Sequence, residues 1–189
     1  MTRKGALGLV RDAWWAASAP MSFFRALHET PAAQLPRALA AALVAVLLAL
    51  VVLSLAFVRA TGSDGFVLVW AFASAIALPY LAMVILLGGL VMVRPAELDL
   101  RAWEIVAWSW VPAGALALSL APAAVVVPLP AAVAGLVAFP FWHVVLVATG
   151  VRVFARRRAL TALMLYLVAV FVVPALLLAV SYAVMSSMR

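Results

Sequence analysis

Cysteine is absent from the 189-residue sequence, which excludes disulfide bonds, thiolate metal sites and cysteine nucleophiles. Charge is also scarce, because only 10% of the residues are charged while 70% are hydrophobic. A soluble globular domain is about half apolar and about a quarter charged, so this composition excludes a water-soluble protein. The sequence also lacks a Ser-His-acid set, a phosphate-binding glycine loop and a metal-ligand spacing. We therefore expect no enzymatic activity and no cofactor.

The few charges are clustered and leave four uncharged runs of 21, 29, 47 and 30 residues. One membrane-spanning helix needs about 20 apolar residues. The longest run therefore holds two spans, joined by a turn at 120–130 that contains Pro122, Pro128 and Pro130. The sequence predicts an all-α integral membrane bundle of five transmembrane helices within a domain at 38–188. The expected spans are 38–58, 66–93, 103–121, 128–151 and 160–185.

The basic residues divide unevenly between the two sides of the membrane that five spans define. With a cytoplasmic N-terminus, segments 1–37, 94–104 and 152–158 lie inside and contain eleven of the 13 basic residues. Only Arg59 and Arg189 fall outside. Because cytoplasmic loops are enriched in Lys and Arg, this distribution predicts an internal N-terminus and an external C-terminus. The net charge of +7 then follows from topology, and nucleic acid is not an expected partner.

The abundance of Ala, Val, Leu, Arg and Pro suits a GC-rich bacterial genome, so we expect the inner (cytoplasmic) membrane of a bacterium. Arg11 and Asp12 interrupt the first apolar stretch, and the first unbroken run is already a full span long. We therefore expect that run to be an uncleaved transmembrane helix rather than a signal peptide.

The N-terminal segment, residues 1–37, carries a helical stripe of apolar residues at steps of three and four. The stripe consists of Leu7, Val10, Trp14, Ala17, Met21, Phe24 and Leu27. Pro20 divides the segment into a helix near 5–18 and a second near 20–29. Aromatic residues with flanking arginines are typical of amphipathic helices in the lipid headgroup plane. Trp14 and Phe24 are thus candidate lipid or partner contacts, and the alternative is a pair of helices packed against the bundle.

All six carboxylates lie in predicted loops or at helix ends. Glu104 is the closest to a span, and we expect it to remain hydrated at the cytoplasmic end of its helix. Because charged groups within the membrane mark ion and proton pathways, their absence from the spans argues against a proton- or sodium-coupled transporter.

His143, beside Trp142, is the exceptional polar residue, since it lies some 13 Å into the membrane from Arg152. Trp142 and His143 are candidate ligand or partner contacts, and His143 is also a candidate protonatable switch. The alternative is a neutral histidine that is hydrogen-bonded to a backbone carbonyl or to a tyrosine such as Tyr80 or Tyr166. A single histidine without a second ligand is not a metal site.

Prolines fall within four of the expected spans, at Pro79, Pro112, Pro140 and Pro174. Such prolines kink helices, and kinked helices either enclose a cavity or form an irregular, compact bundle. The loop between the last two spans contains Arg156, Arg157 and Arg158. These arginines are candidate contacts for anionic lipid headgroups, although membrane topology alone also accounts for them.

Three stretches follow one another in an order that resembles a known family. They are Pro20-Met-Ser-Phe-Phe-Arg-Ala-Leu27; Gly88-Gly89 followed by the charged loop 94–101 and Trp103-Glu-Ile-Val-Ala-Trp-Ser-Trp-Val-Pro112; and Trp142 with Gly150, the basic loop and Ala162. This order is similar to that of the Yip (Ypt/Rab-interacting) membrane proteins and their bacterial relatives. The chain departs from the pattern in having Trp103 and Trp108 where tyrosine is commoner, and it lacks the soluble N-terminal region of eukaryotic members.

The resemblance implies a five-helix bundle with a cytoplasmic N-terminus. Eukaryotic members are associated with vesicle trafficking, membrane shaping and prenylated GTPases, but a bacterial member is not expected to have that partner. Fold likeness alone does not assign a function. The first hypothesis is a non-enzymatic scaffold that binds membrane lipids or partners, or a second copy of itself, and organises the membrane. The alternative is a small permease or lipid-handling transporter subunit with a cavity near His143.

Overall fold

The computed structural model describes residues 6–96, 100–172, 175–176 and 179, and among these it contains helices and no strand. The predicted all-α class is confirmed. The elements are α1 (Ala6–Ser18), α2 (Pro20–His28), α3 (Leu35–Thr61), α4 (Phe66–Ala96), α5 (Leu100–Trp108), α6 (Val111–Val126), α7 (Pro128–Ala155), a 3₁₀ turn (Arg156–Arg158), α8 (Ala159–Leu167) and a π-helical turn (Val168–Val172).

Four helical segments are long and apolar enough to cross a membrane, as expected of a multi-pass membrane protein. They are Leu35–Thr61, Phe66–Val93, Leu100–Val126 and Pro128–Ala155. A shorter apolar segment, Ala159–Val172, begins where the fifth span was expected. Much of the expected span 160–185, including Pro174, lies outside the described residues. The fifth span and the orientation in the membrane therefore stay predictions.

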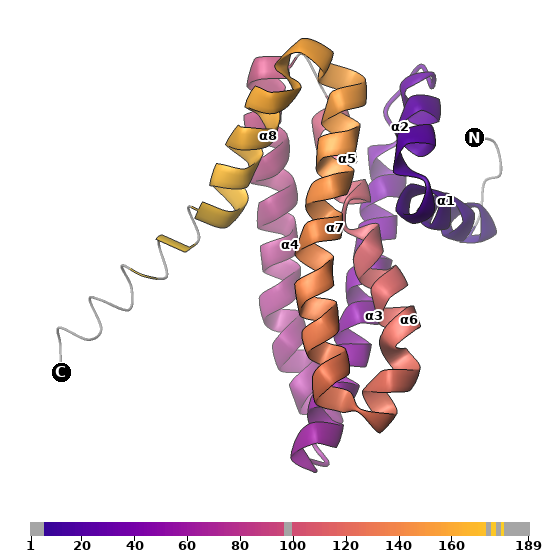
Figure 1. Ribbon diagram of the computed structural model, residues 1–189, viewed down its shortest axis with the longest axis vertical. Helices are drawn as coiled ribbons and strands as arrows, with labels where there is room; N and C mark the ends of the chain where they lie inside the picture. Colours follow the sequence, from indigo (N-terminus) through magenta and orange to yellow (C-terminus); the bar gives the residue numbers. More distant parts are fainter. Residues whose placement is uncertain (1–5, 97–99, 173–174, 177–178, 180–189) are drawn as a thin grey trace.

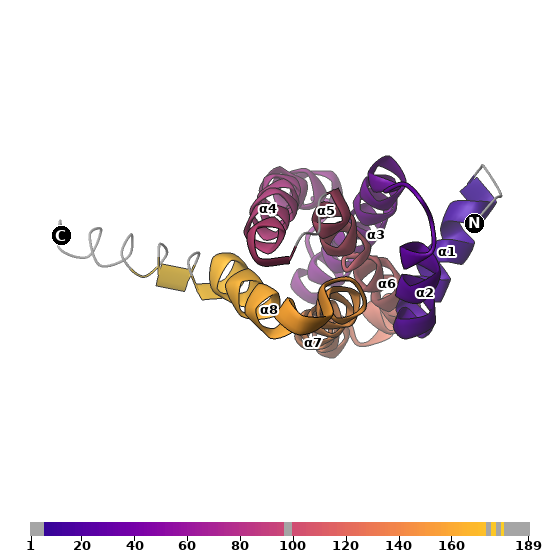
Figure 2. The ribbon, with the colours of Figure 1, turned by 90° about the horizontal axis from the view of Figure 1, so that it is seen from above.

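Helices α3, α4 and α7 run along the length of the bundle, and α5 and α6 follow one another to make a fourth segment (Figure 1). Viewed from above, these helices are grouped side by side, with α1 and α2 on one flank of the group and α8 on another (Figure 2). α1 lies crosswise to the long helices (Figure 1). We call the end where α3 and α5 begin and α7 ends the basic end, and the end with the α3–α4 and α6–α7 connections the distal end.

The α6–α7 connection is sharper than the sequence predicts. Only Val127 separates the two helices, with φ −131° and ψ 67°, and Pro122 lies inside α6 instead of in a turn. Pro128 and Pro130 occupy the first turn of α7, where no backbone N–H is required for a helical hydrogen bond. At the distal end of α3 the chain turns at Gly62, whose φ of 66° is readily adopted by glycine.

The third span is interrupted between α5 and α6, at Ser109 and Trp110. Pro112 lies in the first turn of α6, so it begins a helix instead of kinking one as expected. Pro79 and Pro140 lie within α4 and α7, respectively, as predicted. The interruption frees backbone carbonyl groups at membrane depth, and these groups need other hydrogen-bond partners.

The main core occupies the half of the bundle toward the basic end and combines α1 and α2 with α3, α4, α5, α7 and α8. Phe23 of α2 makes an edge contact with Trp108 of α5, with ring centroids 4.9 Å apart. Glycines permit the closest helix contacts. A Cβ on Gly88 would lie 2.6 Å from the Tyr166 ring, and one on Gly89 would collide with Trp103. The Gly88-Gly89 pair therefore lets α4 approach α5 and α8 closely.

Candidate functional site

A polar centre fills the interruption between α5 and α6. The carbonyl of Ser109 is approached by His143 Nδ1 at 3.1 Å, and His143 Nε2 is paired with the Tyr166 hydroxyl. Because a carbonyl only accepts, Nδ1 donates; in a neutral imidazole Nε2 then accepts the hydrogen bond of the Tyr166 hydroxyl. The interpretation of His143 as a histidine hydrogen-bonded to a backbone carbonyl or to a tyrosine is confirmed, since both kinds of partner are present and the tyrosine is Tyr166.

Aromatic rings enclose this centre. The His143 ring lies 5.2 Å from that of Trp110 and 5.4 Å from that of Phe139. His143 is buried, whereas Trp142 is half-buried and packs against the main core. The imidazole therefore holds α5, α7 and α8 together, and it is not exposed to lipid or to a partner.

Two buried carboxylates lie at the basic end, contrary to the expectation that Glu104 would remain hydrated. Glu104 is fully buried; its Oε2 accepts from Arg101 Nη1 at 2.7 Å, and its Oε1 accepts from the Gln34 backbone N–H at 3.0 Å. Asp12 is also buried and pairs with Arg37 at 2.7 Å. An arginine pairs with each of these charges in place of water, which is how buried charges are usually accommodated. The Asp12 oxygens have no hydrogen-bond partner among the described residues, so this pair is purely ionic.

The Asp12–Arg37 ion pair and the hydrogen bonds of Arg101 hold the N-terminal segment against the bundle. Asp12 lies on α1 and Arg37 on α3. Arg101 on α5 also donates to the Thr30 carbonyl at 2.6 Å in the connection between α2 and α3, and its guanidinium lies 5.7 Å from the Phe154 ring centroid. We call α1 and α2 together the collar, because these contacts hold them against the long helices.

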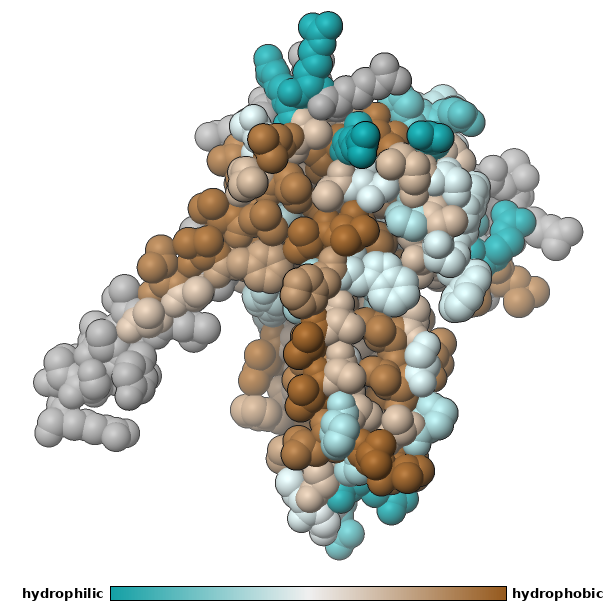
Figure 3. Space-filling view, in the orientation of Figure 1, coloured by the Kyte–Doolittle hydropathy of each residue, from teal (hydrophilic) through white to brown (hydrophobic). Residues whose placement is uncertain are grey.

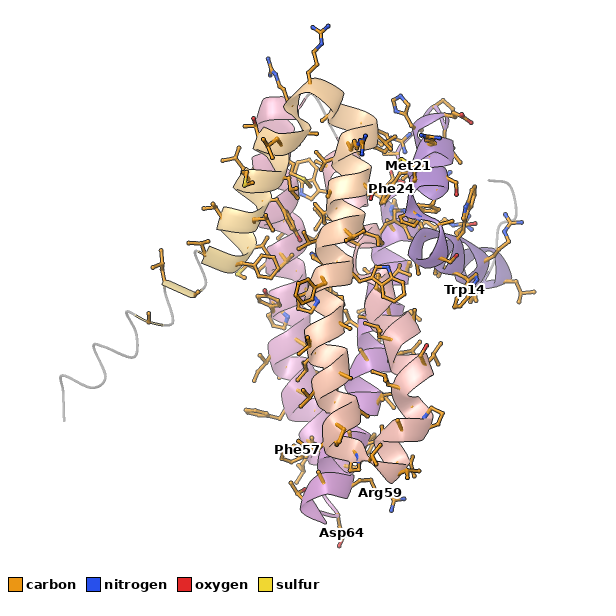
Figure 4. All side chains as sticks on the ribbon, viewed as in Figure 1. Trp14, Met21, Phe24, Phe57, Arg59 and Asp64 are labelled. Atoms are coloured by element: carbon orange, nitrogen blue, oxygen red, sulfur yellow. The ribbon has the colours of Figure 1, made fainter. Side chains whose placement is uncertain are left out.

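The apolar stripe of the collar is divided between two environments. Leu7, Val10 and Trp14 are 88%, 66% and 67% exposed, whereas Phe24 and Leu27 are buried in the main core. Figure 4 shows Trp14 on the outer side of the collar and Phe24 near the bundle. Trp14 is therefore available to lipid or to a partner, and Phe24 is not.

The basic loop forms the 3₁₀ turn at the basic end. Arg157 and Arg158 are exposed there, while the side chain of Arg156 lies outside the described residues. Arg59 and Asp64 lie at the distal end (Figure 4). Contact between this loop and anionic headgroups stays a prediction.

An apolar crevice occupies the distal half, between α3, α4, α6 and α7. It consists of two adjoining cavities of about 170 Å³ and 310 Å³. Their shared lining comprises Leu50, Leu53, Ala56, Ala132 and Leu136. Trp110 and Phe139 border the smaller cavity, and they separate it from His143, which lines neither cavity. Figure 3 shows the corresponding half of one face as mostly brown and tan, with teal toward the two ends.

The candidate residues do not meet in one site: Trp14 lies on the collar, Trp142 and His143 lie on α7, and the arginines lie at the basic end. The sequence reasoning missed Ser109, the partner of His143. Pro112 was the available signal, because a proline inside a span disturbs the carbonyls of the preceding turn. It also missed Thr30 and Gln34, whose partners are 71 and 70 residues away along the chain.

The described part of the chain contains no group of three His, Asp or Glu side chains that could hold a metal ion. No protein-family model, curated protein or solved structure matches the chain. The resemblance to the Yip family stays a prediction.

Proposed function

We propose that the chain is a non-enzymatic membrane scaffold of a bacterial inner membrane that binds anionic lipids and membrane partners through its collar. It has five spans, a cytoplasmic N-terminus and an external C-terminus in this proposal. The likeness to the bacterial branch of the Yip family belongs to the same proposal.

The outward-facing side of α1 carries the proposal. Its apolar residues Leu7, Val10 and Trp14 are exposed, while Asp12 is buried against the bundle. A helix that lies across the bundle, with Ala16 and Ala17 in the core and larger apolar side chains exposed, is suited to the boundary between headgroups and acyl chains. The pair between Asp12 and Arg37 holds α1 in this position.

The distribution of charge supports the proposed orientation. Arg37, Arg101 and Arg157 lie toward the basic end, and Arg59 lies at the distal end. An excess of arginine is typical of the cytoplasmic side. Basic residues at that surface attract anionic lipid by about 1 kcal/mol each, which makes the basic end the expected lipid-binding side.

The test replaces exposed apolar residues of α1 with acids. We expect Val10→Glu with Trp14→Glu to lower the retention of phosphatidylglycerol, and of any second copy of the chain, in native mass spectrometry from phosphatidylglycerol-containing nanodiscs. The control, Ser18→Glu with Ala32→Glu, adds the same two negative charges at exposed positions of the N-terminal segment without removing a large apolar side chain. Equal retention by the double variant and the control would contradict the scaffold proposal. Phe24→Glu is unsuitable, because Phe24 is in the core.

A lipid-handling permease or transporter subunit is the second candidate, favoured by the apolar crevice at membrane depth. It requires that the chain move lipid as well as bind it. Transfer of fluorescent phosphatidylcholine between leaflets of reconstituted vesicles measures that activity, and no transfer above protein-free vesicles would remove this candidate.

A further inference from the structure

The two adjoining cavities of the crevice follow one another along the distal half and are partly open. Its lining on α3 extends from Val46 to Ala60, a rise of about 21 Å. Phe57 and Leu136 border it and are exposed. The opening therefore faces the surroundings of the helices, which are acyl chains in a membrane, and the crevice has the elongated form that one extended chain needs.

The lining is apolar apart from two hydrogen-bonding side chains. Ser54 Oγ is buried, with its residue 2% exposed, and Trp110 Nε1 is also buried. Neither atom has a hydrogen-bond partner among the described residues. In contrast, Ser119 and Thr149 donate to the carbonyls of Ala115 and Val145 on their own helices. Ser54 Oγ is thus a donor without an acceptor, in the wall of an apolar crevice.

Ser54 lies near the depth of the ester groups in a lipid leaflet. α3 has 27 residues and is about 40 Å long, so it exceeds a hydrocarbon thickness of about 30 Å by a few ångströms at each end. Ser54 is seven residues, about 10 Å, from the distal end of α3 at Thr61. Its hydroxyl therefore lies just inside the hydrocarbon boundary, where the ester carbonyls of glycerophospholipids begin.

We propose that the crevice binds one acyl chain of a glycerophospholipid from the distal leaflet. The ester carbonyl accepts a hydrogen bond from Ser54 Oγ, and the chain extends along Leu50 and Leu53 toward Trp110, whose ring closes the inner end. A dry, apolar cavity of about 150 Å³ already suffices to bind a small apolar ligand. This inference deepens the second candidate function, but it requires binding alone and not transfer between leaflets.

The experiment measures lipid retained by the purified full chain in native mass spectrometry, after equilibration with dioleoylphosphatidylcholine or its diether analogue. The diether lipid has the same chains but no ester carbonyl. We expect the wild type to retain the ester lipid about fivefold more than the ether lipid, the factor expected for one hydrogen bond. Ser54→Ala should abolish this preference, whereas Ser119→Ala, at an exposed serine, should preserve it.

A second pair of variants tests the crevice by filling it. Ala132→Phe enters both cavities and should lower retention of both lipids, whereas Ala134→Phe, at an exposed position on the same helix, should not. Unchanged retention in Ala132→Phe would overturn the proposal. The proposal would also be overturned if Trp110→Phe retained less lipid while Ser54→Ala kept the wild-type preference for the ester lipid. That result would mean that Trp110, and not Ser54, donates the hydrogen bond to the lipid.

The chain has no cysteine, so cysteines introduced in pairs can be cross-linked specifically. Such cross-links identify other occupants of the crevice. Paired cysteines at Ala132 and Tyr182 that cross-link within one chain would place the C-terminal segment in the crevice and overturn the proposal. A cross-link between two chains through Ala132→Cys alone would assign the crevice to a second copy, with the same consequence. Retained lipid without transfer between leaflets would support this inference and remove the lipid-handling function.

Discussion

The two halves of the bundle are held together differently. Toward the basic end, the Asp12–Arg37 ion pair and the hydrogen bonds of Arg101 and His143 join different elements, and rings pack edge to face. Gly150 of α7 allows Ile105 to approach closely, since a Cβ there would lie 2.6 Å from Ile105 Cγ2. Toward the distal end, alanine, valine and leucine border two cavities.

This difference in contacts indicates which half of the bundle can change shape. Lipid chains are as apolar as the helix surfaces, so helices in a membrane associate through close packing and polar contacts and not through hydrophobic burial. The basic half has both kinds of interaction. The distal half has close packing between α3 and α6, where a Cβ on Gly114 would lie 2.9 Å from Ala45 Cα, but it has few polar contacts. Separating its helices therefore breaks fewer polar contacts. A rigid half that carries the collar is thus joined to a half that can accommodate a ligand.

The largest change in stability is expected from removing the cation of a buried ion pair in the basic half. Arg101→Leu leaves Glu104 as an unpaired buried carboxylate and removes a donor from the Thr30 carbonyl. We expect the free energy of unfolding to fall by about 3–5 kcal/mol, measured by denaturant titration in detergent. Arg157→Leu, at an exposed arginine, should change it by less than about 0.5 kcal/mol. A similar small change for both variants would show that the basic half does not depend on its ion pairs.

Local features of the basic half could be predicted from the sequence. Pro20 marks the beginning of α2 because proline suits the first turn of a helix. The expectation that His143 is hydrogen-bonded followed from the need of a buried imidazole for partners in an apolar span, although it did not identify Ser109. Both inferences rest on one residue and its immediate chemistry, so no knowledge of the helix arrangement was needed.

Features that depend on helix arrangement could not be predicted. Glu104 is buried because Gln34 and Arg101 cover it, and Gln34 is 70 residues distant along the chain. The apolar stripe of the collar is divided because α2 enters the core while α1 presents Trp14 outward. The crevice likewise results from how four helices diverge, and its residues are the same alanines and leucines that fill close-packed interfaces elsewhere.

The same substitution at two glycines of α7 compares the packing of the halves directly. Gly150→Ala places a Cβ 2.6 Å from Ile105 and 3.2 Å from Phe24, whereas Gly135→Ala meets only Leu120 Cδ1 at 3.2 Å. Leu120 borders a cavity and can move. We expect Gly150→Ala to reduce the free energy of unfolding by about 1–3 kcal/mol and Gly135→Ala to leave it within about 0.5 kcal/mol. Equal losses of unfolding free energy in the two variants would mean that both halves are equally closely packed.

The smallest expected effect is a gain in stability from filling the crevice. Ala56 is buried and borders both cavities, so Ala56→Leu adds apolar contacts where space exists. In detergent without phospholipid, we expect the free energy of unfolding to rise by about 0.5–1 kcal/mol. Ala102→Leu, in the close-packed basic half, should lower it by about 1–3 kcal/mol. With dioleoylphosphatidylcholine added, the gain for Ala56→Leu should disappear, because the wild type is then stabilised by the acyl chain that the leucine displaces. A gain that persists at saturating lipid would mean that the crevice remains unoccupied in the membrane, and the distal half would then be loosely packed without being a binding site.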